Sequence, residues 1–599
     1  MSEELNKVET TVKVAGKDCF FVSLFLSQGF NRHHHFEITV NYEELDEKWM
    51  GSPVKMIQLI GEKVNITIVH RTSGEQILFE GLITNVDFSG YHGQQNDIII
   101  SGSSNTIKLD GKDTMDSFMD KPLKQVIEEA VGNSGNEGEV TAAPVYSQKL
   151  DYLCQYNETC FEFLNRLSWL YGEWFFNDGI TTYFGKPKQD DPVEVIYDVH
   201  MTQFDMKAKL VPPKFNRYQY LVHDDNEIKH DAPPEVNGVR GYLQASLGRS
   251  DETYTSDAQL PLEAVVTSKK DLEDMVKVEK SRAVGSMLVM SGNTQTCKVK
   301  IGQLLKIKFP EKMEVDIKEV DTFLVTEVTH RVDQAGHYQN SFTGILSDLD
   351  NIPMSPVSAP VANPQIAWVK TNEDDKMLGR VKVQFQWQKK DDKTTNWIRV
   401  QATDAGKSDK VPKNRGLVTV PEKDDIVMIG FEYGDPNRPF VMGSIFSEKV
   451  SKGGDVNNKI KSYTTRVDSS VTFNDEEGSI TIKDQQGADS TMTFDGKQNI
   501  HINAEKSILL TSGESSILMQ ADGTINITGV NITINGSANA KMLSGGAQFD
   551  ATAKGNKANV TGTTTTVHGG DTTTISGQTK TTVTAVGPTI IDGAVIKLN

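Results

Sequence analysis

Residues 500–534 read IHINAEKSILLTSGESSILMQADGTINITGVNITI, and a short pattern recurs in this stretch about every eight residues. Each repeat contains two apolar side chains separated by one residue: Ile508 and Leu510, Ile517 and Met519, Ile525 and Ile527. This period of two indicates β-strands, because successive side chains of a strand point to opposite faces. One strand of eight residues cannot bury a face alone. The repeat therefore predicts many stacked strands around a shared core, with other copies of the chain contributing to it.

The same repeat continues towards the end of the chain. Val567, Ile575, Val583 and Ile591 are spaced eight residues apart, and Thr supplies about half of residues 561–584. Thr is β-branched, favours strands and forms hydroxyl ladders between stacked neighbours. A disordered Thr- and Gly-rich tail is the alternative interpretation, because few large apolar groups are present. We predict a stacked β structure over residues 463–599.

Length, charge and cysteine content limit the possible classes of protein. The chain has 599 residues, which suggests three to five domains, and a formal net charge of −19, which argues against a nucleic-acid partner. The start MSEELNKVET predicts no signal peptide, and the longest apolar run, 20–26, is too short for a membrane span. The four cysteines form no CxxC pair and are expected to be buried or half-buried thiols in a reducing cytoplasm.

The first 350 residues combine short β-favouring runs with a few helices. Runs at 20–26, 36–40, 64–69, 77–79 and 98–100 predict a barrel or sandwich. We place barrels at about 1–115 and 236–350, around an α/β insert at about 116–235.

Helix signals are concentrated in the insert and shortly after it. Lys121–Gly132 carries apolar residues on one helical face, and Thr159 with Glu162 fits a capping box that opens a helix ended by Gly172. Asn177-Asp178-Gly179 is typical of a β-hairpin turn, and Ser268 opens a further predicted helix at Asp271–Met287.

A Pro-rich linker at 351–364 precedes a β unit at 365–447, and a connector follows at 448–462. The β unit contains five strand-like runs: Gly379–Trp387, Asn396–Gln401, Gly416–Val420, Ile426–Phe431 and Phe440–Gly443. Short strands in this number fit an OB-type (oligonucleotide/oligosaccharide-binding) barrel. Trp387 and Trp397 fall at alternating strand positions and are expected in its core.

The segment DPNRP at 435–439 predicts a rigid turn on this barrel, because Pro fixes φ and Asp and Asn favour tight reversals. We expect Asp435, Pro436 and Arg438 to set a strand connection, with Arg438 contacting a neighbouring subunit.

No residues stand out as catalytic, cofactor-binding or metal-binding. The chain lacks HExxH, GxSxG and Walker A patterns. The run His33-His34-His35 supplies at most two ligands on one strand face, so exposed strand histidines are expected rather than a metal site. His330 and His337 are interpreted as structural. The chain is therefore predicted not to be an enzyme.

Three stretches together resemble the VgrG spike proteins of type VI secretion systems. They are NETCFEFLNRLSWLYGEW (157–174), TFLVTEVTHRVDQAGHYQNSFTGI (322–345) and the ordered runs GRVKVQFQW, WIRVQATDAG and DDIVMIGFEYGDPNRPFVMGSIF of the β unit. With the terminal repeat, the resemblance covers nearly the whole chain and extends to the hub and spike proteins of contractile phage tails.

This resemblance implies a mainly β homotrimer with a hub-like base, an OB-fold neck and a needle in which three chains intertwine as a triangular β-prism. It implies a puncturing spike, assembled in the bacterial cytoplasm and injected by the contractile apparatus. The implied partners are the inner-tube protein, baseplate proteins, a PAAR-like tip protein, cargo effectors and, transiently, the target membrane. Segment 444–463 leaves no room for the lysozyme domain of phage relatives, and the chain shows no toxin domain after the repeat.

The end of the chain is apolar, with Ile590, Ile591, Val595, Ile596 and Leu598 close together. Exposed apolar patches usually mark interfaces, so we predict that the tip protein docks there. The alternative is that these side chains fold over the core of the prism.

Two other functions stay open at this level. A spike of a phage tail or extracellular injection system shares nearly the same physics. A glycan-binding or glycan-cleaving tail protein would need convergent carboxylates or an aromatic platform in a groove.

Overall fold

The computed structural model describes residues 6–41, 57–91, 94–221, 226–310, 319–451, 453–485, 490–541 and 580–593, with a few further positions at 564, 566, 572, 574–576 and 595. The chain forms two compact units, 1–453 and 454–599. The first unit contains the segments predicted as base and neck, and the second contains the segment predicted as needle. These names are kept below, and each unit is described by itself.

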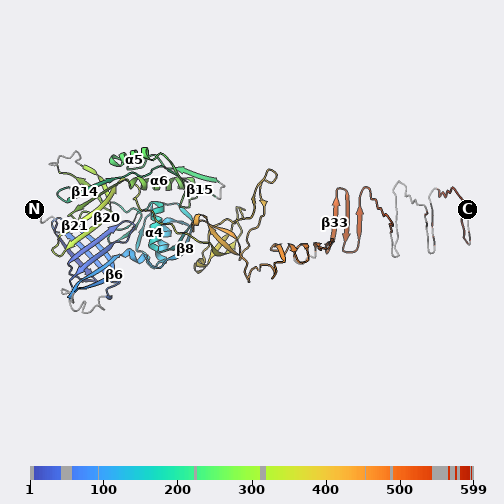
Figure 1. Cartoon of the computed structure of the whole chain (residues 1–599), viewed down its shortest axis with the longest axis horizontal. Helices are drawn as coiled ribbons and strands as arrows, with labels where there is room; N and C mark the ends of the chain where they lie inside the picture. The colour runs from blue at the N-terminus through green and yellow to red at the C-terminus, as the bar shows by residue number, and fades with distance from the viewer. Residues whose placement is uncertain are drawn as a thin grey trace. The chain divides into compact units, whose positions relative to one another are not determined.

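A thirteen-stranded sheet forms the framework of the base (Figure 1). Its main strand order is β14-β18-β21-β20-β3-β4-β7-β6-β5-β1-β2, with β19 beside β20 and β13 beside β19. Its strands are β1 (Val8–Val14), β2 (Lys17–Asp18), β3 (Ser23–Gly29), β4 (His35–Val40), β5 (Lys63–His70), β6 (Gln76–Tyr91), β7 (Gln94–Ser104), β13 (Val193–Ile196), β14 (Met201–Ala208), β18 (Leu288–Thr294), β19 (Leu304–Lys308), β20 (Glu319–Asp333) and β21 (Tyr338–Leu346). The five runs predicted near the N-terminus lie in β3 to β7. The strands expected in two barrels thus join in one sheet.

The insert carries smaller sheets between the two halves of this framework. They pair β8 (Thr114–Pro122) with β10 (Lys149–Glu158); β11 (Phe175–Asn177) with β12 (Thr182–Phe184) and β9 (Val140–Ala142); and β15 (Phe215–Leu221) with β16 (Asn226–Asp231) and β17 (Ala258–Pro261). A 3₁₀ turn, η2 (Asn105–Leu109), leads into the insert. The hairpin β11–β12 encloses Asp178-Gly179, as its turn signal predicts.

Four helices lie in the described part of the base: α3 (Leu123–Asn133), α4 (Cys160–Tyr171), α5 (Gly241–Thr253) and α6 (Lys269–Gly285). The helix α4 begins with the predicted capping box of Thr159 and Glu162 and ends at Gly172 in the left-handed conformation. The Ser268 side chain caps α6 by accepting from the Asp271 amide. The prediction of a single helix after residue 240 was wrong, because α5 was missed; it buries only Leu243, Leu247 and Ser250, so its apolar period is weak.

The neck barrel has fewer regular strands than its sequence predicts. Its sheet runs β23 (Lys382–Phe385), β22 (Gln365–Thr371), β26 (Ile426–Phe431), β27 (Pro439–Ser444), and a short pair joins β24 (Ala405–Gly406) to β25 (Arg415–Gly416). Two 3₁₀ turns complete it, η3 (Gln386–Asp391) and η4 (Glu432–Gly434). Segment 396–401 makes only single bridges, Ile398 with Val381 and Val400 with Val441, and so does not form a regular strand.

Trp387 therefore lies in η3 and not on a strand. Its ring stacks on Phe385 at 5.3 Å between centroids, at the edge of the buried core formed by Val369, Val383, Val427, Ile429 and Val441. The interior of the barrel is thus apolar, and both Trp387 and Trp397 are half-buried at its margin, not in the core as predicted.

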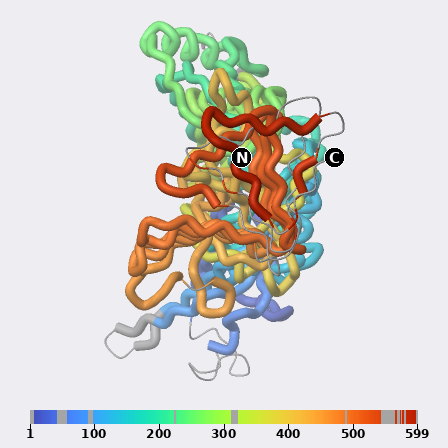
Figure 2. The backbone as a smooth tube through the Cα atoms, turned by 90° about the vertical axis from the view of Figure 1, so that its right-hand side faces the viewer, coloured from blue at the N-terminus to red at the C-terminus, as the bar shows by residue number. Residues whose placement is uncertain are grey.

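In the second unit, successive strands pair side by side in antiparallel order. Five strands form one sheet, shown in orange in Figure 2: β28 (Ile460–Thr464), β29 (Ser470–Asn474), β30 (Ser479–Lys483), β31 (Thr491–Phe494) and β32 (Ile500–Asn503). Three more form another: β33 (Ser507–Ser512), β34 (Ser515–Gln520) and β35 (Ile525–Thr528). The intertwining of three chains that the resemblance implies stays a prediction.

All four cysteines are buried free thiols, as predicted. Among the described residues, no helix combines the length and apolar character needed to cross a lipid bilayer.

Candidate functional site

The seam between the neck barrel and the base is organised around the turn at 435–439. This turn connects η4 to β27, and Arg438 reaches across it to the base. The Arg438 Nη2 donates to the carbonyl oxygens of Leu262 at 2.6 Å and Ala264 at 3.2 Å. Arg438 thus holds the neck to the base within one chain, and its predicted contact with a neighbouring subunit stays a prediction.

The other residues of the turn are also held by contacts within the chain. Asp435 accepts from the Asn437 amide at 2.9 Å and forms an ion pair with Arg438 at 3.2 Å. Burial raises the pKa of the Asp435 carboxyl, although Arg438 opposes the shift. The Asn437 Oδ1 accepts from the backbone amide of Cys154 at 2.7 Å, which joins the turn to β10. Pro436 is buried beside it.

Behind the turn lies a buried ion pair of the base. Arg166 donates through Nε and Nη2 to the two carboxylate oxygens of Glu158, at 2.6 and 3.0 Å. Its Nη2 also donates to the Cys154 carbonyl at 2.7 Å, on the residue that Asn437 holds from the neck. Burial raises the pKa of the Glu158 carboxyl, while Arg166 lowers it. The pair therefore supports the strand on which the neck rests.

Polar pairs extend the seam along the face of β8 and β10. Lys393 of the neck donates to Asp116 at 2.6 Å and to Glu129 at 3.0 Å. Three side-chain hydrogen bonds accompany it: Gln388 to Ser117, Asn396 to Asp151 and Gln365 to Tyr156. The seam is thus held by directional contacts, which fix the orientation of the neck on the base more sharply than apolar packing alone.

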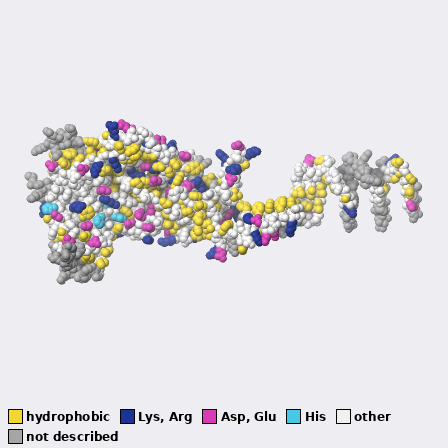
Figure 3. Space-filling model, in the orientation of Figure 1, with side chains coloured by type: hydrophobic (Ala, Val, Ile, Leu, Met, Phe, Trp, Pro, Cys, Tyr) yellow, Lys and Arg dark blue, Asp and Glu magenta, His cyan; other side chains and the backbone are white. Residues whose placement is uncertain are grey.

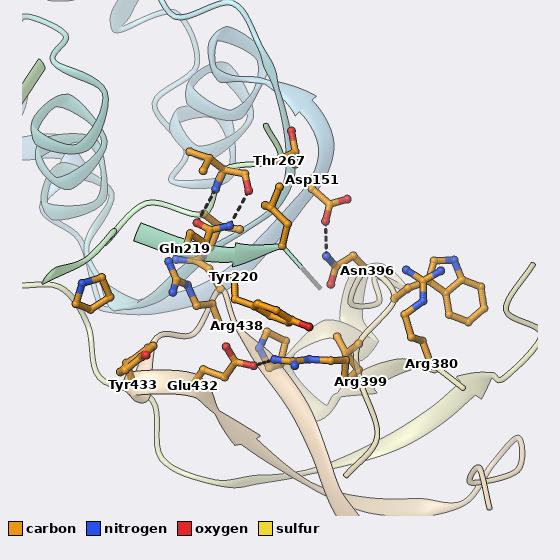
Figure 4. Close-up of a pocket in the computed structure, with 18 of the residues that line it drawn as sticks. Asp151, Gln219, Tyr220, Thr267, Arg380, Asn396, Arg399, Glu432, Tyr433 and Arg438 are labelled. Carbon is orange, nitrogen blue, oxygen red and sulfur yellow. Dashed lines mark hydrogen bonds and ion pairs between the residues drawn. The ribbon is translucent and has the colours of Figure 1, made fainter. Parts of the chain in front are cut away.

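A hollow of about 210 Å³ opens beside the seam, lined by Tyr220, Trp397, Arg399, Glu432 and Tyr433 among others (Figure 4). Its two carboxylates are engaged: Glu432 pairs with Arg399, and Asp151 accepts from Asn396 at 2.6 Å. The hollow is therefore a gap in the seam whose acidic groups already have partners.

Replacing Arg438 by Ala is expected to lower the free energy of unfolding of the first unit by about 2–3 kcal/mol, because charged hydrogen bonds are lost and Asp435 loses its partner. Urea unfolding measures this change. Arg249→Ala is the matched control, because the Arg249–Glu252 pair is exposed. An effect no larger than that of the control contradicts the structural role. If Arg438→Ala still forms a trimer of normal mass, the predicted contact of Arg438 with a neighbouring subunit is wrong.

The histidine run is not wholly exposed, which corrects the prediction. His34 is fully buried, His33 is half-buried and stacks on Phe161 at 3.8 Å, and only His35 is exposed. The reason is that the run begins before β4, where His33 packs on Phe161 of α4 and His34 contacts Gln28 and Phe79 of the base sheet. Among the described residues, no group of three His, Cys, Asp or Glu side chains is arranged to hold a metal ion.

The buried histidines belong to a polar network that crosses the sheet. Gln28 contacts His34 Nδ1 and His330 Nε2, each at 3.2 Å, and His330 Nδ1 lies 2.8 Å from the Tyr338 hydroxyl. Burial lowers the pKa of both imidazoles to about 3. His330 is thus structural, as predicted. His337 lies outside this network, where it pairs with Asp333 at the surface.

The base is expected to lose stability as the pH falls below about 6.5. Both imidazoles have a lower pKa in the folded than in the unfolded chain, so their contribution is complete above the unfolded pKa and decreases as protons bind the unfolded state. The slope is roughly 1 kcal/mol per pH unit for each histidine. Urea unfolding between pH 7.5 and 5 tests this. His330→Gln should reduce the slope and His337→Gln, at an exposed site, should not; equal slopes in all three proteins contradict the prediction.

The predicted tip residues are only partly within the described chain. Ile590, Ile591 and Val595 are exposed. Ile596 and Leu598 lie outside the described residues. Docking of a tip protein therefore stays a prediction.

Sequence reasoning missed most of the seam. Lys393, Asp116, Glu158 and Arg166 are ordinary charged residues in the sequence, and no local pattern marks their pairing across the fold. The turn at 435–439 was found because its Pro and Asp residues carry a local conformational signal.

Two families of known proteins match this chain, one over the base and one over the neck barrel. The family model of the phage tail baseplate hub matches residues 29–336, just over half of the chain. The model of the type VI secretion system and phage-baseplate injector OB domain matches residues 365–446. The hub framework followed by an OB neck defines a structural hub and spike protein, and the chain belongs to the phage tail baseplate hub family.

The resemblance to VgrG spike proteins is confirmed by relatives. The chain is 22% identical to the type VI secretion system spike protein VgrG1a of Pseudomonas aeruginosa, over 84% of this chain and 90% of the relative. A local match to VgrG1c of the same species is 33% identical over 16% of this chain and 13% of the relative. A chain of the Francisella PdpA–VgrG complex shares the fold with a TM-score of 0.52 at 8% identity, covering 83% of this chain and 80% of that one.

Proposed function

We propose that three copies of this chain form the puncturing spike of a type VI secretion apparatus. One observation carries this proposal: the needle strands expose an apolar face that no other described part of the chain covers. A soluble protein rarely leaves such a face open to water.

The register of the strands defines this face. In the second needle sheet, Ile508 lies opposite Met519, Leu510 opposite Ile517, and Ile517 opposite Ile527. Directly opposed residues share a face, so these side chains form one apolar surface. In the first sheet, the corresponding surface includes Phe473, Ile480, Phe494 and Ile500. Hydrophobic side chains gather along these strands in Figure 3.

The exposure of this face shows that none of the residues described by the structure packs over it. In the second sheet, Leu510 is 51% exposed and Ile525 is 63% exposed. The other face of the first sheet carries the cross-strand series Thr472, Thr481, Thr493 and His501 and is suited to water. Three copies that bring their apolar faces together would bury them in a prism and cover the free strand edges.

The domain division follows from this assignment. Residues 1–350 are the base, with barrels at about 1–115 and 236–350 around the insert at about 116–235. The linker occupies 351–364, the OB neck 365–447, the connector 448–462 and the needle 463–599. In this arrangement the base binds the inner tube and baseplate, and the neck passes the load to the needle.

The spike is assembled in the cytoplasm, carries effectors and crosses the target membrane when the apparatus contracts. The similarity to relatives named as type VI secretion system spike proteins favours this apparatus over a phage tail. Subunits that bury a shared apolar core along the whole needle resist separation, which suits a part that is pushed. No catalytic step is part of this function.

The exposed end of the needle is the docking site for a PAAR-like tip protein. Deleting 594–599 is expected to abolish co-purification of the tip protein while the trimer persists. Undiminished binding by the truncated trimer would remove this part of the proposal.

Export through the apparatus is tested in the host cell. Tagged full-length chain is expected in the culture medium of a strain with an intact contractile sheath and to be absent from the medium of a sheath-deletion strain, at equal cellular levels. Equal release from both strains contradicts the proposed function.

A further inference from the structure

The neck barrel has an unusually apolar surface for a domain with its own core. Ten large hydrophobic side chains are exposed in residues 361–446, against twelve over the described part of residues 6–360, which is nearly four times as long. Scattered exposed apolar residues are normal, but this density is typical of an interaction surface.

One part of this apolar surface lies on a turn between β22 and β23, which exposes two large side chains to solvent. Met377 is 90% exposed and Leu378 is 51% exposed; together they are named the neck knob. Met377 adopts φ of +54°, a conformation that a residue with a side chain rarely takes without support. A large apolar side chain is thus presented to water in a strained conformation.

The support of the knob is Asp374. Its carboxylate accepts from the amides of Lys376 at 3.1 Å and Leu378 at 3.0 Å, and from Arg380 Nε at 2.9 Å and Nη2 at 2.6 Å. Both side chains of the Asp374–Arg380 pair are almost completely buried. Hydrogen bonding to Arg380 holds the pKa of the Asp374 carboxyl well below its usual range. The knob is therefore preorganised, and binding would cost little ordering entropy.

A second apolar feature lies on the outer face of the sheet β22–β26–β27. It consists of Ile366, Met428, Phe440 and Met442 and is named the neck strip. Ile366 lies opposite Met428, and a Cβ added to Gly430 would meet the ends of Phe440 and Met442. The alternate residues of these strands fill the core, so the strip faces away from it.

Two unlike features on one barrel fit a ring of three copies. A two-fold contact uses the same patch twice and cannot relate three subunits, so a closed trimer needs a head-to-tail contact between different patches. The connector between Ser444, the end of β27, and Ile460, the start of β28, has only 15 residues. Its fully extended length is about 50 Å, so in a trimer joined by its needles no neck barrel can lie farther than this from the start of its own needle. The neighbouring copy is thus the apolar partner held closest.

We propose that in the trimer the neck knob of each chain packs on the neck strip of the next, which locks the three barrels into a ring. This proposal rests on the trimer proposed above. It assigns a second, independent contact between subunits, in addition to the apolar face of the needle.

Thiol protection in the full-length protein tests the contact. Single substitutions Met377→Cys and Met442→Cys place a thiol on each feature, and Val145→Cys places one at a comparably exposed site of the base, because Val145 is 79% exposed. The four native cysteines are buried and do not compete. The rate of modification by a maleimide–polyethylene glycol is compared in native protein and in denaturant, with the native mass recorded in parallel.

The expected result is a trimer in which the thiols at 377 and 442 react at least ten-fold more slowly than the thiol at 145, after division by their rates in denaturant. A trimer with all three rates within two-fold of one another would overturn the neck contact while leaving the needle trimer intact. Protection of only one of the two sites would overturn the knob-on-strip pairing. A monomer would overturn both proposals.

Discussion

Ile517→Asp is expected to convert the trimer into monomers. Ile517 lies on the apolar face of β34, opposite Leu510 on β33 and Ile527 on β35. In the proposed prism, each trimer would bury three carboxylates with no partner in this apolar face. An uncompensated buried charge costs about 3–5 kcal/mol. The effect is read as a loss of the trimer by light scattering at a protein concentration at which the unaltered chain is fully assembled.

Ser516→Asp is the matched control, because Ser516 is the preceding residue of the same strand and points to the opposite face. It adds the same charge and should leave the trimer intact. Equal behaviour of the two variants would show that the apolar face is not the subunit interface.

Arg166→Ala is expected to destabilise the first unit by about 3–5 kcal/mol, because Glu158 would be left buried without its partner. Burial already raises the pKa of the Glu158 carboxyl, and Arg166 is the group that opposes this rise, so its removal leaves the cost of burial without compensation. The Cys154 carbonyl would also lose a donor, and Cys154 is the point at which Asn437 fastens the neck. The expected signs are a lower unfolding midpoint and faster hydrogen exchange in β10.

The double variant Arg166→Met with Glu158→Leu distinguishes the effect of an unpaired buried charge from the effect of lost side-chain volume. It removes both charges and keeps apolar bulk, so most of the lost stability should return. If the double variant is as unstable as Arg166→Ala, the buried ion pair is not the cause of the loss.

The fold could be predicted from the sequence where local signals determine structure. Thr159 and Glu162 fix the start of α4 through short-range hydrogen bonds, and Gly172 fixes its end through its left-handed conformation. The alternation at Ile508 and Leu510 fixes which side chains share a face. These signals need no knowledge of distant residues.

The seam could not be predicted, because its contacts join residues far apart in the chain. Lys393 meets Asp116, and Asn437 meets Cys154, only after the neck has folded against β8 and β10. The burial of His34 has the same origin. His34 lies just before β4, and the Gln28 and Phe79 side chains that contact it belong to β3 and β6. The helix α5 was missed for a different reason, since it buries only three side chains and lacks a strong apolar period.

In the proposed spike, the needle joins three chains. The most direct test of this is the native mass of the purified full-length protein by light scattering. One species of about 199 kDa, three times the 66.3 kDa chain, is expected. A monodisperse species of 66.3 kDa would contradict the proposed spike, because the apolar face of the needle would then have to be covered within a single chain.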